Sequence, residues 1–217
     1  MILFHAGDSW SGQLAPLGSG TDGRPIVIDS YGKGGRPVIH GPGTNGSSAL
    51  LLKDESYWEI NNLEVTNTAT EAAGALRGIY VVGSSPTQLW HHIYIRNCYV
   101  HDVNSEGYGK PGYSKMSGGI IFAINIQDAL IEGCHVANVA VEGIRNSSPL
   151  TTSRLVIRRN LVENVYGDGI VLHGSSGGSR IEDNAVHNAC MSDAANYAAG
   201  WTYERRASTH VFAADLH

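Results

Sequence analysis

Residues 155–179, LVIRRNLVENVYGDGIVLHGSSGGS, decide the fold. A short β run from Leu155 to Ile157 leads to a bend with Asn160, and Asn164 marks a second bend. A further β run follows at residues 169–173, and a Gly/Ser turn closes the unit. Self-similar units of this kind are the signature of a repeat architecture, so other parts of the chain should carry copies of it.

Copies of the unit recur through most of the chain. Their first β runs are Trp58-Glu59-Ile60, Ile93-Tyr94-Ile95, Leu130-Ile131, Leu155-Val156-Ile157 and Ile181. The next shared position is a valine: Val65, Val100, Val136, Val162 and Val186. Two residues later stand Asn67, Asp102, Asn138, Asn164 and Asn188. The second runs open at Gly78-Ile79, Gly119-Ile120, Gly143-Ile144, Gly169-Ile170 and Gly200-Trp201.

These matching registers predict an all-β coil of short parallel strands. A single turn cannot bury its own apolar side, whereas stacked turns bury a continuous core and pair their backbones. Asn or Asp stacked at a bend is expected to bond to the backbone of the neighbouring turn. The longer copies carry insertions at residues 68–76 and 104–117, which are expected to wall a binding face.

Composition limits the classes of function. The chain has 217 residues, 27 glycines and 16 % charged residues, which suits short strands joined by tight turns. A net charge of -5 argues against nucleic-acid binding, and there is no apolar run long enough to span a membrane. The first ten residues lack the features of a secretory signal peptide.

The repeat pattern resembles a known family. Its Ile-x-Asn-x-x-Val-x-Asn…Gly-Ile-x-Val spacing, from about residue 57 to 203, is similar to the right-handed parallel β-helix proteins of the pectin-lyase-like superfamily, with PbH1-type repeats. Residues 7–39, GDSWSGQLAPLGSGTDGRPIVIDSYGKGGRPVI, are similar to the opening segment of secreted bacterial members. The resemblance implies a right-handed parallel β-helix of about six to seven turns, and an extracellular or periplasmic location.

The ends of the chain depart from this family. Members usually have a leader, an N-terminal strand region and a capping helix before a segment like that at residues 2–4, and residues 204–217, ERRASTHVFAADLH, no longer fit the repeat. We therefore expect a β-helix at residues 1–203 with an atypical tail at 204–217, in a chain truncated at both ends. An unusually short family member is the alternative. Uncapped ends expose strand edges, so self-association into a homo-oligomer through an end or the tail is expected.

A carboxylate pair is the first candidate for chemistry, since the resemblance implies a carbohydrate-active ancestor. Alternation along the second strands places Glu142 and Asp168 on adjacent turns, beside Arg145 and near His173. Glycoside hydrolysis needs one carboxyl group as an acid and a second as base or nucleophile. Turn residues that bond to backbone N–H groups are the structural alternative for both carboxylates. Arg145, His173, Tyr80, Tyr108, Tyr113 and Lys115 would then bind the polysaccharide or oligosaccharide.

Two further classes of function remain open. A polysaccharide lyase would use Arg145, His173 or the Tyr/Lys insertion at residues 108–115 for β-elimination, and Ca²⁺ would then be a cofactor candidate, whereas the hydrolase needs none. A non-catalytic carbohydrate-binding or structural β-helix is the third reading. The ten histidines show no metal-ligand spacing, so no metal site is predicted. Cys98, Cys134 and Cys190 are expected to be reduced, although Cys98 and Cys134 share a column and a strained disulfide is the alternative.

Overall fold

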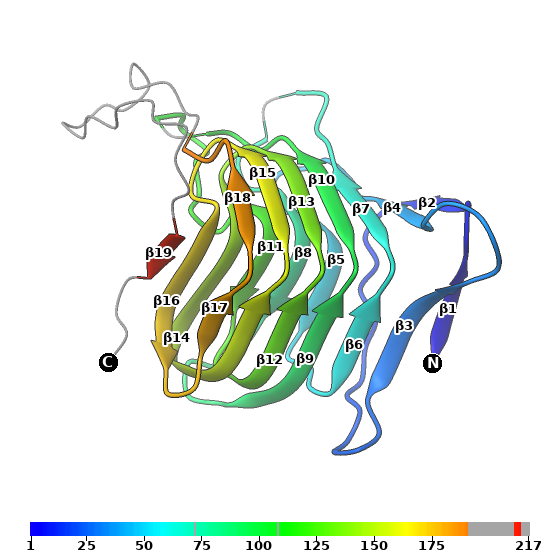
Figure 1. Cartoon of the computed structure of the whole chain (residues 1–217). Helices are drawn as coiled ribbons and strands as arrows, with labels where there is room; N and C mark the ends of the chain where they lie inside the picture. Colours follow the sequence, from blue (N-terminus) through cyan, green and yellow to red (C-terminus); the bar gives the residue numbers. More distant parts are fainter. Residues whose placement is uncertain (72, 108, 191–210, 214–217) are drawn as a thin grey trace.

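The strands follow one another around a common axis in three parallel columns, as the computed structural model shows (Figure 1). The structure describes residues 1–71, 73–107, 109–190 and 211–213. The first column contains β1 (Ile2–His5), β3 (Ile26–Tyr31), β6 (Trp58–Asn61), β9 (Trp90–Arg96), β12 (Ile126–Glu132), the second half of β14 (Glu142–Arg158) and β17 (Arg180–Glu182). The second contains β2 (Ser9–Ser11), β4 (Val38–His40), β7 (Glu64–Asn67), β10 (Tyr99–Val103), β13 (His135–Val139), β15 (Leu161–Val165) and β18 (Ala185–His187). The third contains β5 (Ser48–Lys53), β8 (Arg77–Val82), β11 (Gly118–Ala123), the first half of β14, β16 (Ile170–Ser176) and β19 (Val211–Ala213).

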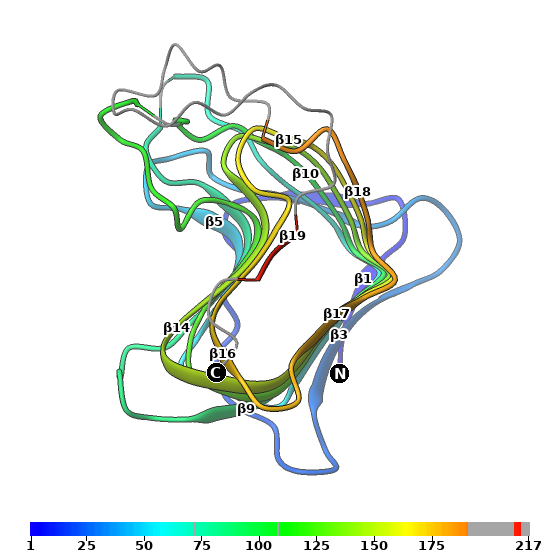
Figure 2. The same cartoon turned by 60° about the vertical axis from the view of Figure 1, so that its left-hand side comes forward.

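The predicted parallel coil is confirmed. Every pairing between these strands is parallel, and β14 runs round a corner without a break, which joins the first and third columns into one sheet. No helix occurs in the part of the chain that the structure describes, and so none there is long and apolar enough to cross a membrane. Figure 2, seen closer to the axis, shows the coils superimposed around one interior.

The registers predicted for the valines and for the isoleucines after the glycines are those of the structure. The predicted valines pair in one continuous column: Val65, Val100, Val136, Val162 and Val186. The isoleucines after the glycines do the same: Ile79, Ile120, Ile144 and Ile170. All of these side chains are 0–3 % exposed and lie in the core. Trp201, expected in the same column, lies outside the described residues.

The valine and glycine columns face each other across the interior, which explains why they recur together. A Cβ at Gly143 would lie 2.7 Å from Cγ1 of Val162, and one at Gly119 would collide with Cγ1 of Val136. Real Cβ atoms are not found so close to a neighbour, so a larger residue would push the two columns apart. The Gly-Ile step therefore lets the third column approach the second.

Asparagine and aspartate occupy the outer bend between the second and third columns. Asp102, Asn138, Asn164 and Asn188 all have φ between 52° and 55°, a left-handed conformation that Asn and Asp tolerate. We expected these side chains to bond to the backbone of the neighbouring coil, but they bond to one another. Asn164 Nδ2 donates to Asn138 Oδ1 at 3.2 Å, and Asn188 Nδ2 donates to Asn164 Oδ1 at 3.1 Å. The expected ladder exists, but its bonds join side chains.

Asn67 departs from that ladder. The register between β7 and β10 shifts at His101, so that Val103 rather than Asp102 pairs with Asn67. Asn67 is fully buried, donates Nδ2 to the Arg77 carbonyl at 2.9 Å and accepts the Gly43 N–H at 2.9 Å. It therefore anchors the corner that leads into the third column.

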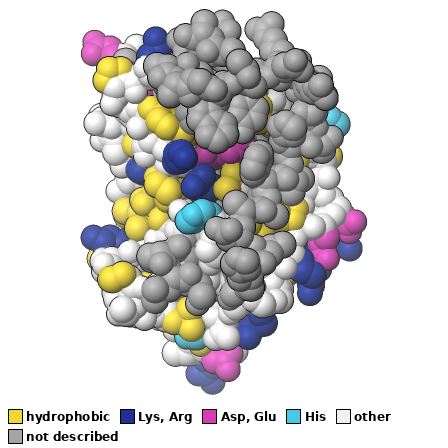
Figure 3. Space-filling view, turned by 90° about the vertical axis from the view of Figure 1, so that its left-hand side faces the viewer, with side chains coloured by type: hydrophobic (Ala, Val, Ile, Leu, Met, Phe, Trp, Pro, Cys, Tyr) yellow, Lys and Arg dark blue, Asp and Glu magenta, His cyan; other side chains and the backbone are white. Residues whose placement is uncertain are grey.

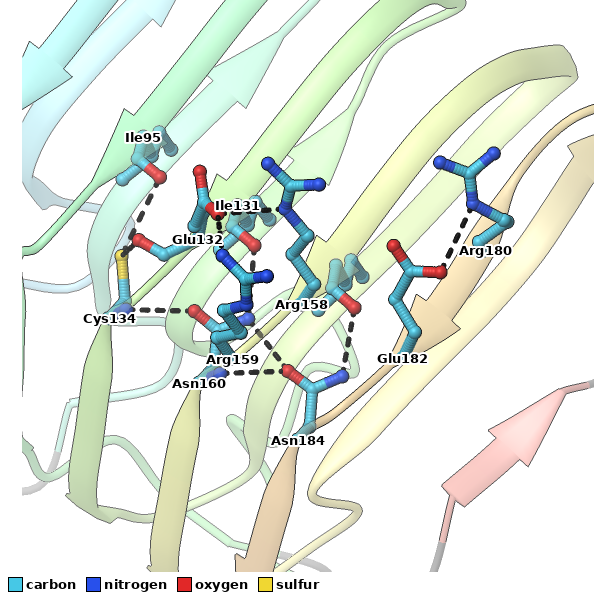
Figure 4. Close-up of polar contacts among 11 residues, drawn as sticks. Ile95, Ile131, Glu132, Cys134, Arg158, Arg159, Asn160, Arg180, Glu182 and Asn184 are labelled. Atoms are coloured by element: carbon cyan, nitrogen blue, oxygen red, sulfur yellow. Dashed lines mark hydrogen bonds and ion pairs between the residues drawn. The ribbon is translucent and has the colours of Figure 1, made fainter.

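A second ladder lies inside the coil, at the bend between the first and second columns (Figure 4). Asn160 Oδ1 accepts the Cys134 N–H at 2.9 Å, and Asn184 Oδ1 accepts the Asn160 N–H at 3.0 Å. Asn160 Nδ2 donates to the Ile131 carbonyl at 3.0 Å. Cys134 continues the column, and its thiol contacts the Ile95 carbonyl at 3.7 Å. Cys98, Cys134 and Cys190 are all free, as predicted.

The insertions pack together at the corner beyond β5, where Figure 2 shows several loops side by side. The Glu106 N–H donates to the Ala73 carbonyl at 2.8 Å, and the Gly118 N–H donates to the Leu76 carbonyl at 2.9 Å. Arg77 ties the same corner, since its Nη1 donates to the Gly46 carbonyl at 3.0 Å and its Nε to that of Met116. The insertions therefore border the start of the third column.

The atypical tail at residues 204–217 and the self-association through an end of the coil both stay predictions. Of the tail at 204–217, the structure describes only β19, which pairs with β16 and so belongs to the third column. At the other end β1 pairs with β3, and Ile2 and Leu3 on it are 38 % and 48 % exposed. An exposed strand of this kind fits the expected self-association.

Candidate active site

The candidate site lies where the third column begins. Ser48, Arg77, Gly118 and Glu142 occupy equivalent positions in successive coils. Asp168 follows in the same series, because Ile144 pairs with Ile170 and the Gly143 N–H donates to the Asp168 carbonyl at 2.9 Å. Glu142 and Asp168 are therefore neighbours on adjacent coils, as the spacing of the repeat predicted.

Glu142 is buried without being fully paired. Its side chain is 0 % exposed, and Oε1 accepts Nη1 of Arg145 at 3.2 Å. Oε2 is buried and has no hydrogen-bond partner. An unpaired buried oxygen of this kind costs about 1–3 kcal/mol, so it calls for an explanation beyond packing.

Burial makes Glu142 an acid at neutral pH. Removal from water, followed by the charge of Asp168, raises its pKa to about 8. The charge of Arg145, the backbone N–H of Asp168 and the charge of Lys115 act in the opposite direction and offset the rise only in part. At pH 7 the carboxyl group is therefore mostly protonated and can donate a proton.

A glycine lies directly against the backbone of Glu142. Gly118, the register partner of Glu142, has φ +137°, and a Cβ there would collide with the Glu142 carbonyl. The hydroxyl of neighbouring Ser117 is fully buried and unpaired, as is Nε of Arg145. Three side chains at this corner thus carry polar atoms without partners. Ser117 was not predicted, because nothing in the repeat pattern distinguishes it from an ordinary loop serine.

Asp168 is partly exposed and has a second neighbour. Oδ1 accepts a hydrogen bond from the thiol of Cys190, with the sulfur 3.5 Å away. Cys190 comes from the next coil, so it could not be placed here without knowing the path of that corner. It completes the order Glu142, Asp168, Cys190 across three successive coils.

The other predicted residues surround this centre to different degrees. Lys115 is exposed, yet its charge acts on Glu142. Tyr80 is half-buried, with the Arg77 guanidinium 4.3 Å from its ring centroid. Tyr113 is half-buried on the 104–117 insertion, and Tyr108 lies outside the described residues.

His173 lies further along the sheet. It is exposed and stands two positions beyond Val171, the register partner of Arg145. It lies five positions after Asp168, a step that along a strand is about 16 Å. His173 therefore lies well away from the two carboxylates.

The outer side of the third column is apolar around Arg145. Its register partners Ile121 and Val171 are 0 % and 6 % exposed and lie outside the interior cluster. On the face that lies on the left of Figure 1, Figure 3 shows acidic, basic and histidine side chains gathered among apolar ones. Such a mixture suits a sugar, which has apolar faces and polar edges.

The donor set gives no metal centre in the described residues. No group of three or more His, Cys, Asp or Glu side chains gathers there at metal-binding distances. Several of the described histidines instead pair with carboxylates, for example His135 with Glu163 at 2.8 Å and His92 with Glu59 at 2.9 Å.

Comparison with known proteins identifies the repeat. The family described as "Right handed beta helix region" matches residues 39–211. A curated relative, the lacto-N-biosidase of Bifidobacterium longum, is 26 % identical over 87 % of this chain, which spans 16 % of that enzyme's length.

Two solved structures share the fold. The GH136 lacto-N-biosidase from Eubacterium ramulus has a TM-score of 0.67 at 23 % identity, over 81 % of this chain and 38 % of the enzyme. The alginate lyase from Paenibacillus sp. has a TM-score of 0.55 at 20 % identity, over 86 % of this chain and 67 % of the lyase.

Proposed function

Because the chain belongs to the right-handed β-helix family, we propose that it is a carbohydrate-active protein that hydrolyses a glycosidic bond of an extracellular oligosaccharide or polysaccharide. Glu142 is the acid in this proposal and Asp168 its carboxylate partner. The observation that carries it is the fully buried Glu142, with one oxygen unpaired and a pKa raised to about 8 beside a second carboxylate.

The proposed chemistry gives the two carboxyl groups different roles. Glu142 gives its proton to the leaving glycosidic oxygen, and Asp168 either attacks the anomeric carbon or removes a proton from the water that does so. Arg145 already contacts Oε1 of Glu142, so it stabilises the carboxylate that forms when the proton leaves. Because Glu142 is fully buried, the substrate can reach it only if the protein around this corner moves.

Turnover of defined glycans tests this proposal. An aryl lacto-N-bioside and a panel of neutral and acidic oligosaccharides would be incubated with the chain, and released sugar measured. Glu142→Gln keeps the shape but cannot donate the proton, so we expect a loss of about a thousandfold in kcat. Glu132→Gln is the matched control, since Glu132 pairs with Arg158 on the first column, and its turnover should match the unaltered chain.

The pH dependence gives a second criterion. Since the acid must be protonated, kcat/KM should persist up to about pH 8 and fall above it. Turnover that is equal in Glu142→Gln and Glu132→Gln, or no turnover of any glycan, would refute the hydrolase. The anomeric configuration of the first product, read by NMR, assigns attack by Asp168 or by water.

A polysaccharide lyase is the second candidate. Arg145 and Lys115 stand beside a Glu142 that is mostly neutral at pH 7, and positive charge suits the carboxylate of a uronate. Alginate and polygalacturonate oligomers in the same panel, with and without Ca²⁺, test it. An unsaturated uronate in the ultraviolet spectrum would indicate elimination, and binding without product would indicate the non-catalytic reading.

A further inference from the structure

Asp168 lies between two protonated groups on the coils before and after it. Glu142 precedes it and Cys190 follows it, with the thiol sulfur 3.5 Å from Oδ1. Cys190 itself is held in a left-handed conformation, with φ 56°, and its N–H donates to the Gly167 carbonyl at 2.7 Å. That conformation costs about 1–2 kcal/mol for a residue with a Cβ, and the hydrogen bond to Gly167 helps to hold it.

The thiol is electrostatically linked to both carboxyl groups. Burial raises the pKa of Cys190 to about 12, and the charge of Asp168, its hydrogen bond and the charge of Glu142 add to the effect. Cys190 therefore remains a donor at any pH at which the protein would work. A thiol has a single proton to donate, so the bond to Oδ1 leaves the other oxygen of Asp168 for a different partner.

An unpaired oxygen of Glu142 also marks this place as a site for a ligand. Oε2 of Glu142, one coil away, is fully buried and unpaired. We propose that Cys190 is a positioning residue, which fixes Oδ1 of Asp168 through its S–H so that the second oxygen meets the glycan or the attacking water. This inference rests on the proposed function and adds a residue to it.

Alkylation of Cys190 tests the linkage without any glycan. Cys98 and Cys134 are fully buried, so under native conditions neutral iodoacetamide should react with Cys190 alone, followed by mass spectrometry of its peptide. With a thiol pKa near 12, alkylation at pH 8 should be at least a hundredfold slower than that of glutathione. Asp168→Asn removes the charge, and alkylation should then accelerate by about tenfold.

Asp183→Asn is the matched control. Asp183 is exposed at the bend after β17, in a left-handed conformation that Asn also accepts, and it should leave the alkylation rate unchanged. An Asp168→Asn rate within twofold of the Asp183→Asn rate would overturn the inference. Thermal unfolding of both variants shows that each is folded when alkylated.

A kinetic arm separates positioning from structure. On a glycan that the unaltered chain turns over, Cys190→Ala should lower kcat by about tenfold with KM within twofold, while Cys190→Ser, which keeps a donor, should recover most of the loss. Equal kcat in Cys190→Ala and the unaltered chain would refute the role. If no glycan is turned over, the proposed function fails, and the alkylation result still decides whether Cys190 is coupled to Asp168.

Discussion

The inner bend at Asn160 and the corner at Glu142 are both polar clusters buried in the same solenoid, but they are satisfied to different degrees. At the bend, Asn160 bonds to the Cys134 N–H, the Ile131 carbonyl and Asn184, all within 3.0 Å. At the corner, Oε2 of Glu142, Nε of Arg145 and the hydroxyl of Ser117 have no partner. The first arrangement stabilises the coil, whereas the second costs stability, which is the expected mark of a functional site.

The largest difference should appear in Asn160→Leu. This change leaves the Cys134 N–H, which is buried, without its acceptor and removes two donated bonds, so the free energy of unfolding should fall by about 3 kcal/mol. Urea denaturation measures it. Glu142→Gln, the matching change at the corner, should not destabilise the chain. Equal losses in both variants would erase the distinction between the two regions.

The pH dependence of stability should reveal the Glu142 carboxyl group. Its pKa is raised above the unfolded value near 4.5, so the folded chain binds the proton more tightly. The stability that this group contributes is complete below about pH 4.5 and is lost as pH rises through about 8. Between pH 5 and 7 the free energy of unfolding should fall by roughly 2 kcal/mol more in the unaltered chain than in Glu142→Gln, which lacks the ionisable carboxyl group.

Urea unfolding of both chains at several pH values measures that difference. If the two curves run parallel from pH 5 to 8, Glu142 ionises normally and the corner is not an acid site.

Two buried serines offer a finer comparison. Ser117 is 0 % exposed with an unpaired hydroxyl, whereas the hydroxyl of Ser48, which is 1 % exposed, accepts Nε2 of Gln13 at 3.0 Å. Ser48→Ala should cost about 1 kcal/mol, and Ser117→Ala should be neutral or stabilise by up to about 1 kcal/mol. Thermal unfolding of the two variants measures both changes in stability. A larger loss in Ser117→Ala would mean that its hydroxyl serves the fold.

The smallest effect is expected in the outer ladder. Asn138→Gly keeps the left-handed conformation, with φ 54°, and removes two exposed side-chain bonds, to Asp102 and Asn164. We expect a loss of about 0.5 kcal/mol in urea denaturation, because water replaces both partners. A loss as large as that of Asn160→Leu would show that exposure does not separate the two ladders.

The candidate site was predictable only where it follows the repeat. The adjacency of Glu142 and Asp168 could be predicted because strand register converts equal sequence positions into neighbours on successive coils. The other side chains around Glu142 and Asp168 could not be predicted, because Ser117 and Cys190 come from corners whose lengths vary from coil to coil. The same holds for Asn67, which a shift of register at His101 moves out of the outer ladder and into the interior.

The sequence by itself determined the coil and its register, since the recurring valines and glycines lie against each other when equal positions of the repeat are aligned. It also determined which carboxylates are neighbours. Only the tertiary structure decided how deeply those carboxylates are buried and which groups surround them. Burial and unpaired atoms arise where loops from several coils meet, and there Glu142 becomes an acid with a pKa of about 8 and Asp168 gains a thiol donor. Desolvation depends on every atom around a group, and a linear pattern does not contain those atoms.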